Sequence, residues 1–564
     1  MTRREITVRP ELSDPLYYLR NFHFVLDWVV RRYPDLLAAA EQHFIETLRR
    51  LPEPSQALLV RMVMRKGDCF RADRLTYPEI GDTEQAAEPL LRSGLLTLNP
   101  AVDISQLSRQ LTRPELLALA IRLADTHEDL PRPGASARKR DLVAALAQLY
   151  PEPRAWSDWW PQAPTTLYGL AVMDLCERLR LMFFGNLRQE WSTFVLAELG
   201  LFRYETVPFD DAARPFARRA EVDAWLCLHQ CRERLEQGEP PADILRDIPA
   251  DLPGSNWLSA RRDRVLYRLA YRFERSGDLQ TAARLYADIA VPEARPRLIR
   301  VLELQGQVKA AVSLLDQVLA APDNEAEQQQ AARMAKRLSR KAGQPPPAQP
   351  AAPGWTEQTI QLPLAGNRVE AQVTDHLQTP DAPVYWVENG LINSLLGLLC
   401  WPVIFAPLPG AFFHPFQSAP ADLTRPEFYR RRQDGFEQAL ALLTAGDYQA
   451  RIWHYWHSRQ GVQNPFVHWG LMTRPLLELA LACLPPTHLE LLFRRILFDV
   501  KANRSGLPDL VQFYPAAHSY RLLEIKGPGD RLQDNQIRWL QYCARHEVPA
   551  EVLYVQSDSE TLFD

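Results

Sequence analysis

Apolar residues recur at three- and four-residue intervals through most of the first 340 positions, which is the pattern of amphipathic helices. The pattern is clearest in four segments: residues 16–33, 35–51, 111–124 and 137–150. Thr112 is placed to cap the third of these, and Pro114 falls in its first turn. The N-terminal part of the chain is therefore predicted to be mostly α-helical.

Residues 264–290 and 298–320 repeat one helical pattern. Each has a glycine at the expected helix–helix turn, Gly277 and Gly306, followed by a pair of small alanines. The two glycines are 29 positions apart, near the tetratricopeptide (TPR) period of about 34 residues. The spacing predicts stacked helical pairs in a TPR-like solenoid.

Two patterns differ from the helical one. Residues 510–514 and 520–527 are short apolar runs around a turn, which predicts two paired strands. Residues 391–413 carry no charge and are long enough to span a membrane, but prolines and polar residues interrupt them. We expect a buried helix there, followed by a core strand, and no membrane span.

Composition places the chain among soluble globular proteins. Of its 564 residues 46% are hydrophobic and 24% are charged, which excludes a disordered tail protein, a collagen and a small disulfide scaffold. The net charge of −4 gives no overall sign of nucleic-acid binding. Of the 65 basic residues 58 are Arg, which supplies bidentate phosphate ligands or reflects coding bias in a GC-rich genome.

The seven cysteines are scattered and odd in number, which favours reduced thiols. No second Cys or His pair follows Cys227 and Cys231 at zinc-finger distance. The first residues lack the apolar core of a signal peptide. These features predict a cytoplasmic protein, associated with the nucleoid if it is bacterial.

The clearest boundary is a proline-rich stretch at 342–354. The predicted organisation has six parts: an N-terminal helical DNA-binding region (1–106), a small DNA-binding unit (107–149), a helical connector (150–257), the solenoid (258–341), a linker (342–359) and a C-terminal domain (360–564).

Basic residues gather at two places in the N-terminal part. Arg61, Arg65 and Lys66 lie near the end of one predicted helix, and Arg138, Lys139 and Arg140 start another. Cations and free N–H groups at a helix start suit a phosphate. The helix–loop–helix at 107–149 resembles a SAP module, a small DNA-binding motif. All six residues are candidate DNA contacts; the alternative is a solvated helix end.

The candidate chemistry lies in the C-terminal strand pair. If Tyr514 pairs with Ser519, Asp509 lies opposite Glu524, and Lys526 shares the face of Glu524. Two such close carboxylates repel each other unless a divalent cation lies between them. Mg²⁺ prefers such oxygen ligands, and a bound cation can polarise a phosphodiester and activate a water.

This pattern of Pro-Asp, a 14-residue gap and Glu-Ile-Lys resembles the PD-(D/E)XK nuclease superfamily. Residues 526–540, KGPGDRLQDNQIRWL, resemble the VRR-type nuclease domain. That resemblance implies a helix beside the site, which Asp534 could cap, with Gln536 near the metal centre. It also implies an acidic residue before an earlier helix, a position that Glu388 matches.

The order of the parts is similar to that of the Fanconi-associated nuclease family, as are residues 65–80 and 388–399. The resemblance implies a mostly α-helical multidomain protein with a C-terminal α/β nuclease domain. It implies an endonuclease that cuts branched DNA near 5′ flaps, with 5′-to-3′ exonuclease activity, in interstrand-crosslink repair. Two Mg²⁺ or Mn²⁺ ions would be held by Glu388, Asp509, Glu524 and the carbonyl of Ile525; Lys526 and Gln536 would complete the catalytic set.

Two other functions stay open at this level. The same core could belong to a Holliday-junction or restriction-type nuclease. The solenoid could instead make the chain a non-catalytic scaffold on DNA. Neither the long N-terminal extension of eukaryotic members nor a ubiquitin-binding zinc finger is visible, so ubiquitin is not expected as a partner.

Overall fold

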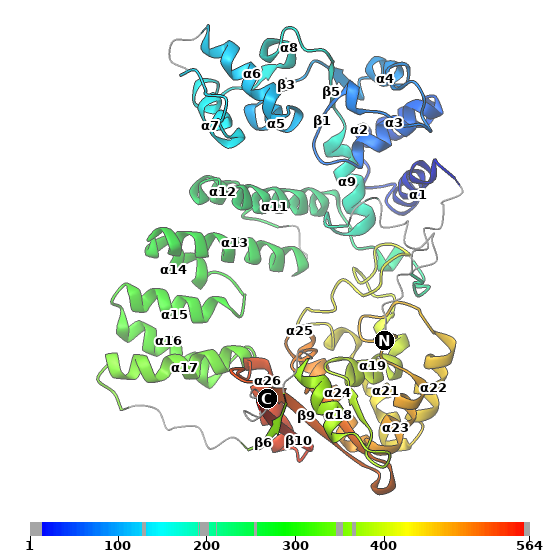
Figure 1. The fold of residues 1–564 in the computed structure, drawn as a ribbon, viewed down its shortest axis with the longest axis vertical. Coiled ribbons are helices and arrows are strands. Elements are labelled where there is room, and N and C mark those ends of the chain that lie inside the picture. Colours follow the sequence, from blue (N-terminus) through cyan, green and yellow to red (C-terminus); the bar gives the residue numbers. More distant parts are fainter. Residues whose placement is uncertain are drawn as a thin grey trace, which may run out of the picture. The chain divides into compact units, whose positions relative to one another are not determined.

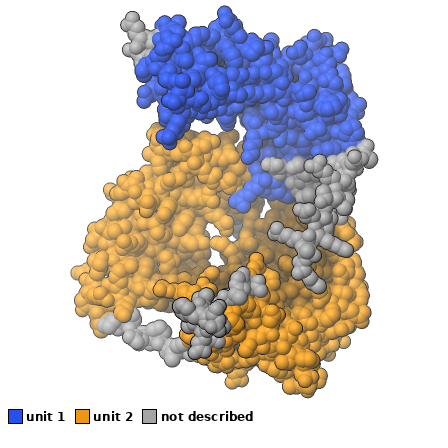
Figure 2. Space-filling view, viewed as in Figure 1, with its two compact units in different colours: residues 1–201 blue, residues 202–564 orange. Residues whose placement is uncertain are grey.

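The chain forms two compact units, Met1–Leu201 and Phe202–Asp564, in a computed structural model (Figure 2). The structure describes residues 14–126, 131–189, 191, 202–209, 211–252, 256–345, 354–363 and 368–557. Residues 346–353 of the predicted linker therefore lie outside the described residues. The predicted fold class, mainly helical with a C-terminal α/β nuclease domain, is confirmed (Figure 1).

Unit 1 combines helices with short strands. Its helices are α1 (Tyr17–Arg32), α2 (Ala39–Arg50), α3 (Glu53–Val63), η1 (Ala72–Arg74), α4 (Thr83–Arg92), α5 (Ile104–Gln110), α6 (Arg113–Ala124), α7 (Lys139–Leu149), α8 (Trp156–Trp159) and α9 (Met173–Phe184). Its strands are β1 (Cys69–Arg71), β2 (Leu96–Leu98), β3 (Ala101–Val102), β4 (Arg154–Ala155) and β5 (Leu167–Leu170). Strand β5 pairs with both β1 and β2, so residues 167–170 belong to the N-terminal sheet.

The predicted two-helix unit is present as α6 and α7. The Thr112 hydroxyl accepts the backbone N–H of Glu115, while the Glu115 carboxylate accepts the N–H of Thr112 at 2.7 Å. This reciprocal pair of bonds is a capping box, and it fixes the start of α6. Apolar residues of both helices share one buried core.

Unit 2 begins with a helical solenoid. Its elements are η2 (Asp211–Ala213), α11 (Arg219–Gln237), α12 (Pro241–Asp247), α13 (Asn256–Ser276), α14 (Leu279–Ala287), α15 (Ala294–Leu304), α16 (Val308–Ala320) and α17 (Glu325–Lys341). Gly277 and Gly306 have φ angles of +91° and +76°, so each forms the left-handed turn between paired helices. The predicted helical pairs are confirmed.

The nuclease part of unit 2 surrounds one sheet. Its strands are β6 (Thr356–Leu362), β7 (Val384–Trp386), β8 (Leu510–Tyr514), β9 (Ser519–Lys526) and β10 (Ala550–Ser557). Its helices are α18 (Val369–Leu377), α19 (Gly390–Leu399), α20 (Trp401–Ile404), η3 (Arg430–Arg432), α21 (Gln433–Ala445), α22 (Tyr448–Ser458), α23 (Arg474–Cys483), α24 (Pro486–Phe498), α25 (Val500–Asn503), η4 (Pro515–Ala517) and α26 (Asp534–Arg545). Strand β6 begins at Thr356, within the range predicted as linker.

The sheet has the order β6-β10-β9-β8-β7. Its first three strands are parallel, and β8 is antiparallel to both β9 and β7. Because side chains alternate along a strand, each face has its own core. Leu510, Leu523 and Ile525 pack in a small cluster with Val373 of α18. Val511, Phe513 and Leu522 join the large cluster built on α19, α21 and α24.

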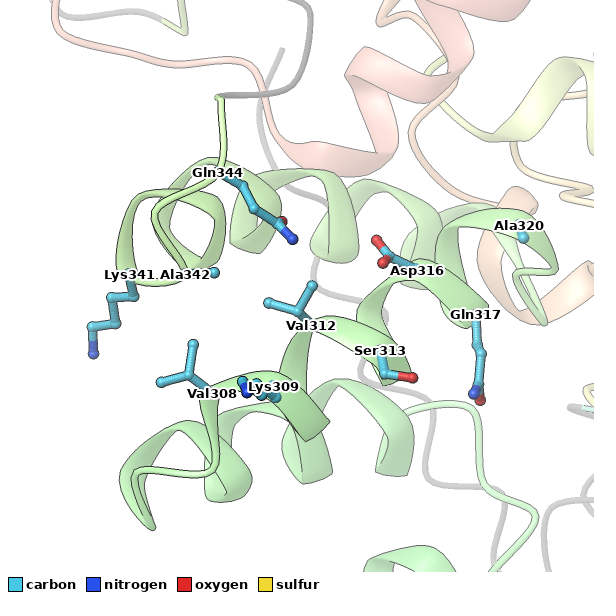
Figure 3. A pocket seen from close by; sticks show the side chains of 10 residues that line it. All are labelled: Val308, Lys309, Val312, Ser313, Asp316, Gln317, Ala320, Lys341, Ala342 and Gln344. Atoms are coloured by element: carbon cyan, nitrogen blue, oxygen red, sulfur yellow. The ribbon is translucent and has the colours of Figure 1, made fainter.

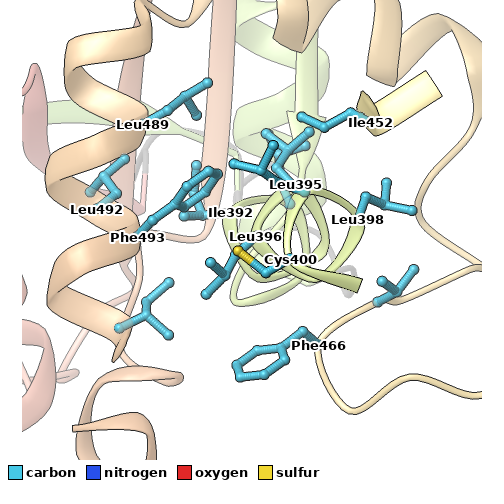
Figure 4. Close-up of a cluster of buried hydrophobic side chains, with 14 of the residues drawn as sticks. Ile392, Leu395, Leu396, Leu398, Cys400, Ile452, Phe466, Leu489, Leu492 and Phe493 are labelled. Atoms are coloured by element: carbon cyan, nitrogen blue, oxygen red, sulfur yellow. The ribbon is translucent and has the colours of Figure 1, made fainter. Parts of the chain in front are cut away.

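The uncharged stretch at 391–413 forms a buried helix but no strand. Residues 391–399 of α19 are buried, and Leu395, Leu396 and Cys400 belong to one apolar cluster with Ile452, Phe466 and side chains of α24 (Figure 4). The strand predicted after it is wrong: residues 405–413 form turns, although Phe412 and Phe413 are buried. Pro407 and Pro409 lie in this segment, and a proline lacks the N–H group that a strand ladder needs.

No single helix among the described residues is both long and apolar enough to cross a membrane; only the pair α23 and α24, bent by 108°, reaches that length and composition together. All seven cysteines are free thiols.

Candidate active site

The centre of the candidate site is the hairpin of β8 and β9. Tyr514 pairs with Ser519, so the predicted register is confirmed. The following pairs run to Leu510 and Leu523, which leaves Asp509 opposite Glu524, just outside the ladder. The Asp509 Oδ2 atom accepts the Ile525 N–H at 2.9 Å, so the carboxylate lies against the strand that carries Glu524.

Glu524 is fully buried, and only one of its two carboxylate oxygens accepts hydrogen bonds. Its Oε1 atom accepts hydrogen bonds from Lys526 Nζ at 2.7 Å and Gln536 Nε2 at 2.6 Å. Its Oε2 atom is buried and meets no donor among the described residues. An unpaired buried carboxylate oxygen costs free energy, so it marks a place for a missing cation or proton.

The environment of Glu524 disfavours its charge. Burial, and next the negative charge of Asp509, raise the pKa of Glu524 to about 8, and the Lys526 ammonium opposes this only in part. Burial also raises the pKa of Asp509, with Glu370 and Glu388 adding repulsion and the Ile525 N–H opposing it. A bound cation would relieve this repulsion.

Strand β7 brings Glu388 to the same end of the sheet. The backbone N–H groups of Val387 and Glu388 both donate to the Asp509 carbonyl, at 2.9 and 2.8 Å. Glu388 is exposed and has a φ of +38°, an unusual value for a residue with a side chain. Helix α19 starts two residues later, with Asn389 rather than Glu388 at its N-cap.

Helix α26 supplies Gln536 to the site. The prediction that Asp534 caps this helix is wrong: Gln533 is the N-cap, and its N–H donates to Gln536 Oε1 at 2.8 Å. Asp534 is the first helical residue and binds Arg333 instead. The Gln536 side chain is therefore held at both ends, by its own helix start and by Glu524.

The acidic residues fit a divalent cation without already forming a closed cage. Within the described residues, no group of three or more His, Cys, Asp or Glu side chains is arranged around one point. Glu524 Oε1 is already engaged by Lys526 and Gln536. The hard oxygen donors and the unpaired Oε2 atom suit Mg²⁺ or Mn²⁺.

The first predicted DNA-contact group lies in unit 1. Arg61 is paired with Glu79 and stacks 3.9 Å from the Tyr18 ring, so it is engaged within the fold. Arg65 and Lys66 are exposed and line a cavity of roughly 140 Å³, whose other cations are Arg71, Arg74 and Arg109. Of the three predicted residues, Arg65 and Lys66 keep the exposure that a phosphate contact requires.

The second predicted DNA-contact group also has one residue bonded within the fold and two at the surface. Lys139 Nζ donates to the Leu111 carbonyl at 2.8 Å. Arg138 and Arg140 are exposed, and Arg140 pairs with the adjacent Asp141 at 3.1 Å. The structure therefore leaves Arg138 and Arg140 at the surface and uses Lys139 to join α7 to the end of α5.

Sequence reasoning missed one acidic residue near the site. Glu370 lies in the first turn of α18, which begins beside the end of β9: a Cβ atom on Gly527 would lie 3.3 Å from Val369 Cγ2. An acid in the first turn of a short amphipathic helix just before a strand is the signal that could have identified Glu370.

The larger groove of the solenoid, roughly 780 Å³ between α16 and α17, lies apart from these residues (Figure 3).

Known proteins similar to this chain cover almost its whole length. Three family models match it: "FAN1, HTH domain" at residues 16–97, "Fanconi anemia-associated nuclease SAP domain" at 101–159 and "VRR-NUC domain" at 443–557. A Fanconi-associated nuclease 1 homolog of Pseudomonas aeruginosa is 47% identical over 549 residues, 97% of each chain. The Arabidopsis thaliana homolog is 25% identical over 93% of this chain and 65% of its own. A crystal structure of paFAN1 bound to 5′ flap DNA with a 2-nucleotide flap and a gap has a TM-score of 0.89 at 46% identity, covering 98% of this chain and all of that one.

Proposed function

Since the chain belongs to the Fanconi-associated nuclease family and is a nuclease, we propose that it is a structure-specific DNA endonuclease that cuts branched DNA near 5′ flaps. We include in this proposal 5′-to-3′ exonuclease activity and a role in interstrand-crosslink repair. The similar structures bound to 1- and 2-nucleotide 5′ flaps support the choice of substrate. The location that fits a DNA substrate and free thiols is the cytoplasm, at the nucleoid.

Nucleases of this type generally use divalent metals. We propose Mg²⁺ or Mn²⁺, two ions, with Asp509, Glu524 and the Ile525 carbonyl as ligands and Glu388 completing the set. The metal, when bound, polarises the scissile phosphate and supplies a hydroxide-like water. The Lys526 ammonium lies beside Glu524 and stabilises charge on the reacting phosphate. Gln536 holds Glu524 in place through the bond to Oε1.

One observation carries the proposal. A single hairpin sets Asp509 against Glu524 and Lys526, and the buried Glu524 Oε2 meets no donor in the part of the chain that the structure describes. A scaffold protein would gain nothing from this costly arrangement, because replacing it with apolar residues would be neutral or stabilising.

The test is cleavage of flapped DNA by Asp509→Asn. We expect cleavage in Mg²⁺ or Mn²⁺ to fall by at least about 1000-fold, since the metal loses a ligand charge. DNA binding measured in Ca²⁺ should stay within about twofold of the unmodified protein. Asp447→Asn, an exposed acid at the start of α22, is the matched control and should cleave normally.

Three results would contradict the proposal. Normal cleavage by Asp509→Asn would remove Asp509 from the catalytic set. A panel of branched substrates addresses the alternative nuclease: faster cleavage of four-way junctions than of 5′ flaps would favour a junction-resolving enzyme. Failure of the unmodified protein to cut any DNA in either metal would favour the scaffold.

The DNA-contact residues belong to the same proposal. We propose that Arg65, Lys66, Arg138 and Arg140 contact phosphates, with Arg61 and Lys139 supporting them from within the fold. Reversing the exposed charges in Arg65→Glu and Lys66→Glu should weaken flap binding and lower the salt dependence of the affinity by about one unit of slope per lost phosphate contact. An unchanged slope would exclude these contacts.

A further inference from the structure

The last helix of the solenoid contacts the helix that carries Gln536, across the proline-rich boundary in sequence. Three residues of α17, Glu325, Gln329 and Arg333, are spaced by four and therefore lie on one face of the helix. Each bonds to the nuclease part of unit 2, and α17 lies beside α26 in Figure 1. We call this set of bonds the α17–α26 contact.

The outer end of the contact is a forked ion pair. Arg333 Nη1 donates to Asp534 Oδ2 at 2.7 Å, and Nη2 donates to the other carboxylate oxygen. Arg333 holds the pKa of Asp534 below its usual range. Because a two-bond guanidinium–carboxylate pair fixes orientation as well as distance, it restrains the first turn of α26.

The inner end is buried. Arg495 of α24 is only 4% exposed and binds Glu325 through two bonds of 3.0 and 2.7 Å. Arg495 also donates to the Arg538 carbonyl of α26 at 3.1 Å and stacks on Trp539 and Tyr542. Between the two ends, Arg538 donates to Gln329 at 2.8 Å. Helix α26 is thus held along more than one turn.

The α17–α26 contact bears on the proposed catalysis through the first turn of α26. Asp534 lies two residues before Gln536, whose amide bonds Glu524 at 2.6 Å. Displacing the first turn of α26 by a fraction of an ångström would lengthen this bond and release Glu524 Oε1, and catalytic geometry tolerates little such movement.

We propose that Arg333 of the solenoid is a positioning residue for the nuclease centre: through Asp534 it fixes the start of α26, and with it the bond of Gln536 to Glu524. The inference rests on the proposed function, because Gln536 and Glu524 belong to that site. It makes the solenoid part of the catalytic architecture and gives α17 a role separate from DNA binding.

The test compares Asp534→Ala, Arg333→Ala and the double variant in single-turnover cleavage of a 5′ flap at saturating DNA. Each single variant should slow the cleavage step about threefold to tenfold, and the double variant should be no slower than either, because both remove one contact. Asp534→Glu keeps the charge and should recover most of the rate. Glu293→Ala is the control: it breaks another solenoid-to-nuclease ion pair, with Lys501, that does not touch α26.

The design separates positioning from DNA binding. If Arg333 instead holds DNA, Arg333→Ala will raise the DNA concentration for half-maximal rate while Asp534→Ala cleaves at the normal rate, which overturns the inference. Equal slowing by Glu293→Ala would also overturn it, since any break between solenoid and nuclease would then suffice. If the unmodified protein cleaves and Asp534→Ala cleaves at the same rate, this inference is wrong while the proposed function stands. If the unmodified protein does not cleave, the proposed function itself is wrong.

Discussion

At the scale of single residues, Glu388 shows a conflict between stability and chemistry. Its φ of +38° suits glycine, and side chains adopt such values at a cost of about 1 kcal/mol or more. The strain accompanies two hydrogen bonds from residues 387 and 388 to the Asp509 carbonyl, which fix Glu388 beside the proposed metal ligands.

Glu388→Gly should therefore stabilise the fold and damage the enzyme. We expect the free energy of unfolding to rise by up to about 1 kcal/mol, as the strain is released. Cleavage should fall at least about tenfold, because a proposed metal ligand is lost. Urea unfolding and flap cleavage measure the two effects. Glu388→Gln removes the charge but keeps the backbone strain, because glutamine also has a Cβ atom. An equal gain in stability in that variant would therefore refute the argument from φ.

His414 should make the fold sensitive to mild acid. Burial lowers the pKa of His414 to about 3, while an unfolded histidine titrates near 6.5. Above pH 6.5 His414 is neutral in both states, and its ionisation does not change the stability. Below pH 6.5 the unfolded chain takes up a proton that the folded protein excludes, so stability falls by about 1.4 kcal/mol per pH unit toward pH 3.

The measurement is urea unfolding at pH 7.5 and pH 5.5. The unmodified protein should lose about 1.4 kcal/mol more than His414→Gln over this interval. The comparison with the variant removes the contribution of the acidic groups that both proteins share. Identical losses in the two proteins would mean that His414 is protonated in the folded state.

The arrangement of the proposed catalytic residues was predictable because their positions are local in sequence. Asp509, Glu524 and Lys526 belong to one hairpin, and a four-residue turn sets its register, so residue spacing alone places them together. Glu370 was not predictable, because its approach to Asp509 depends on how α18 packs on β9. The pairing of Arg61 with Glu79 was not predictable either, since the two residues lie 18 positions apart.

At the scale of elements, α19 is the part of the nuclease core with least room. A Cβ atom on Gly397 would lie 2.8 Å from both Phe466 Cβ and Val467 Cγ2. Contacts that short do not occur, so the segment at 466–467 packs directly on the helix backbone. The Ser394 hydroxyl ties the same segment to α19 by accepting the His468 N–H at 2.9 Å.

Gly397→Ala should consequently destabilise the protein by about 1–3 kcal/mol, the usual cost of overpacking. Thermal unfolding measures the loss. Gly470→Ala is the matched control, because its new Cβ atom would meet His468 at an ordinary 3.7 Å. If both variants unfold at the same temperature, the packing around Gly397 is looser than the distances indicate.

The elements that periodicity predicted well are long or locally capped. Helix α6 follows from Thr112 and Glu115, and the paired helices of the solenoid follow from Gly277 and Gly306. The strand expected after α19 failed because apolar residues at 405–413 are buried without a strand partner, and burial alone does not distinguish a strand from a turn. The cap of α26 failed because Asp534 has a competing partner, Arg333.

At the scale of the whole molecule, the proline-rich boundary in sequence is not a boundary in space. Residues 202–564 form one compact unit, in which Glu325 of the solenoid neutralises the buried Arg495 of the nuclease part. Sequence could not show this, because the two residues lie 170 positions apart and each looks like an ordinary surface charge in its own helix.

A nuclease fragment cut at the predicted linker should therefore fold poorly. A fragment of residues 354–564 lacks Glu325 and leaves the Arg495 guanidinium without its carboxylate, and the loss of such a pair costs up to about 3–5 kcal/mol. A fragment of residues 202–564 keeps the pair and should unfold in one cooperative transition near the temperature of the nuclease part in the full chain. Calorimetry of both fragments decides this; equal stability would mean that the α17–α26 contact contributes nothing to the fold.

The sheet order has a consequence for the making of the protein. The hairpin of β8 and β9, which carries the proposed site, is an inner part of the sheet, yet it is synthesised after β7 and α19, and α26 follows it. Since chains emerge from the ribosome N-terminus first, the helices of unit 1 and the solenoid can fold before Asp509 exists. A nascent chain that has not yet reached residue 536 lacks Gln536 and the neighbouring strand β10, so the proposed site is completed only in the last part of translation.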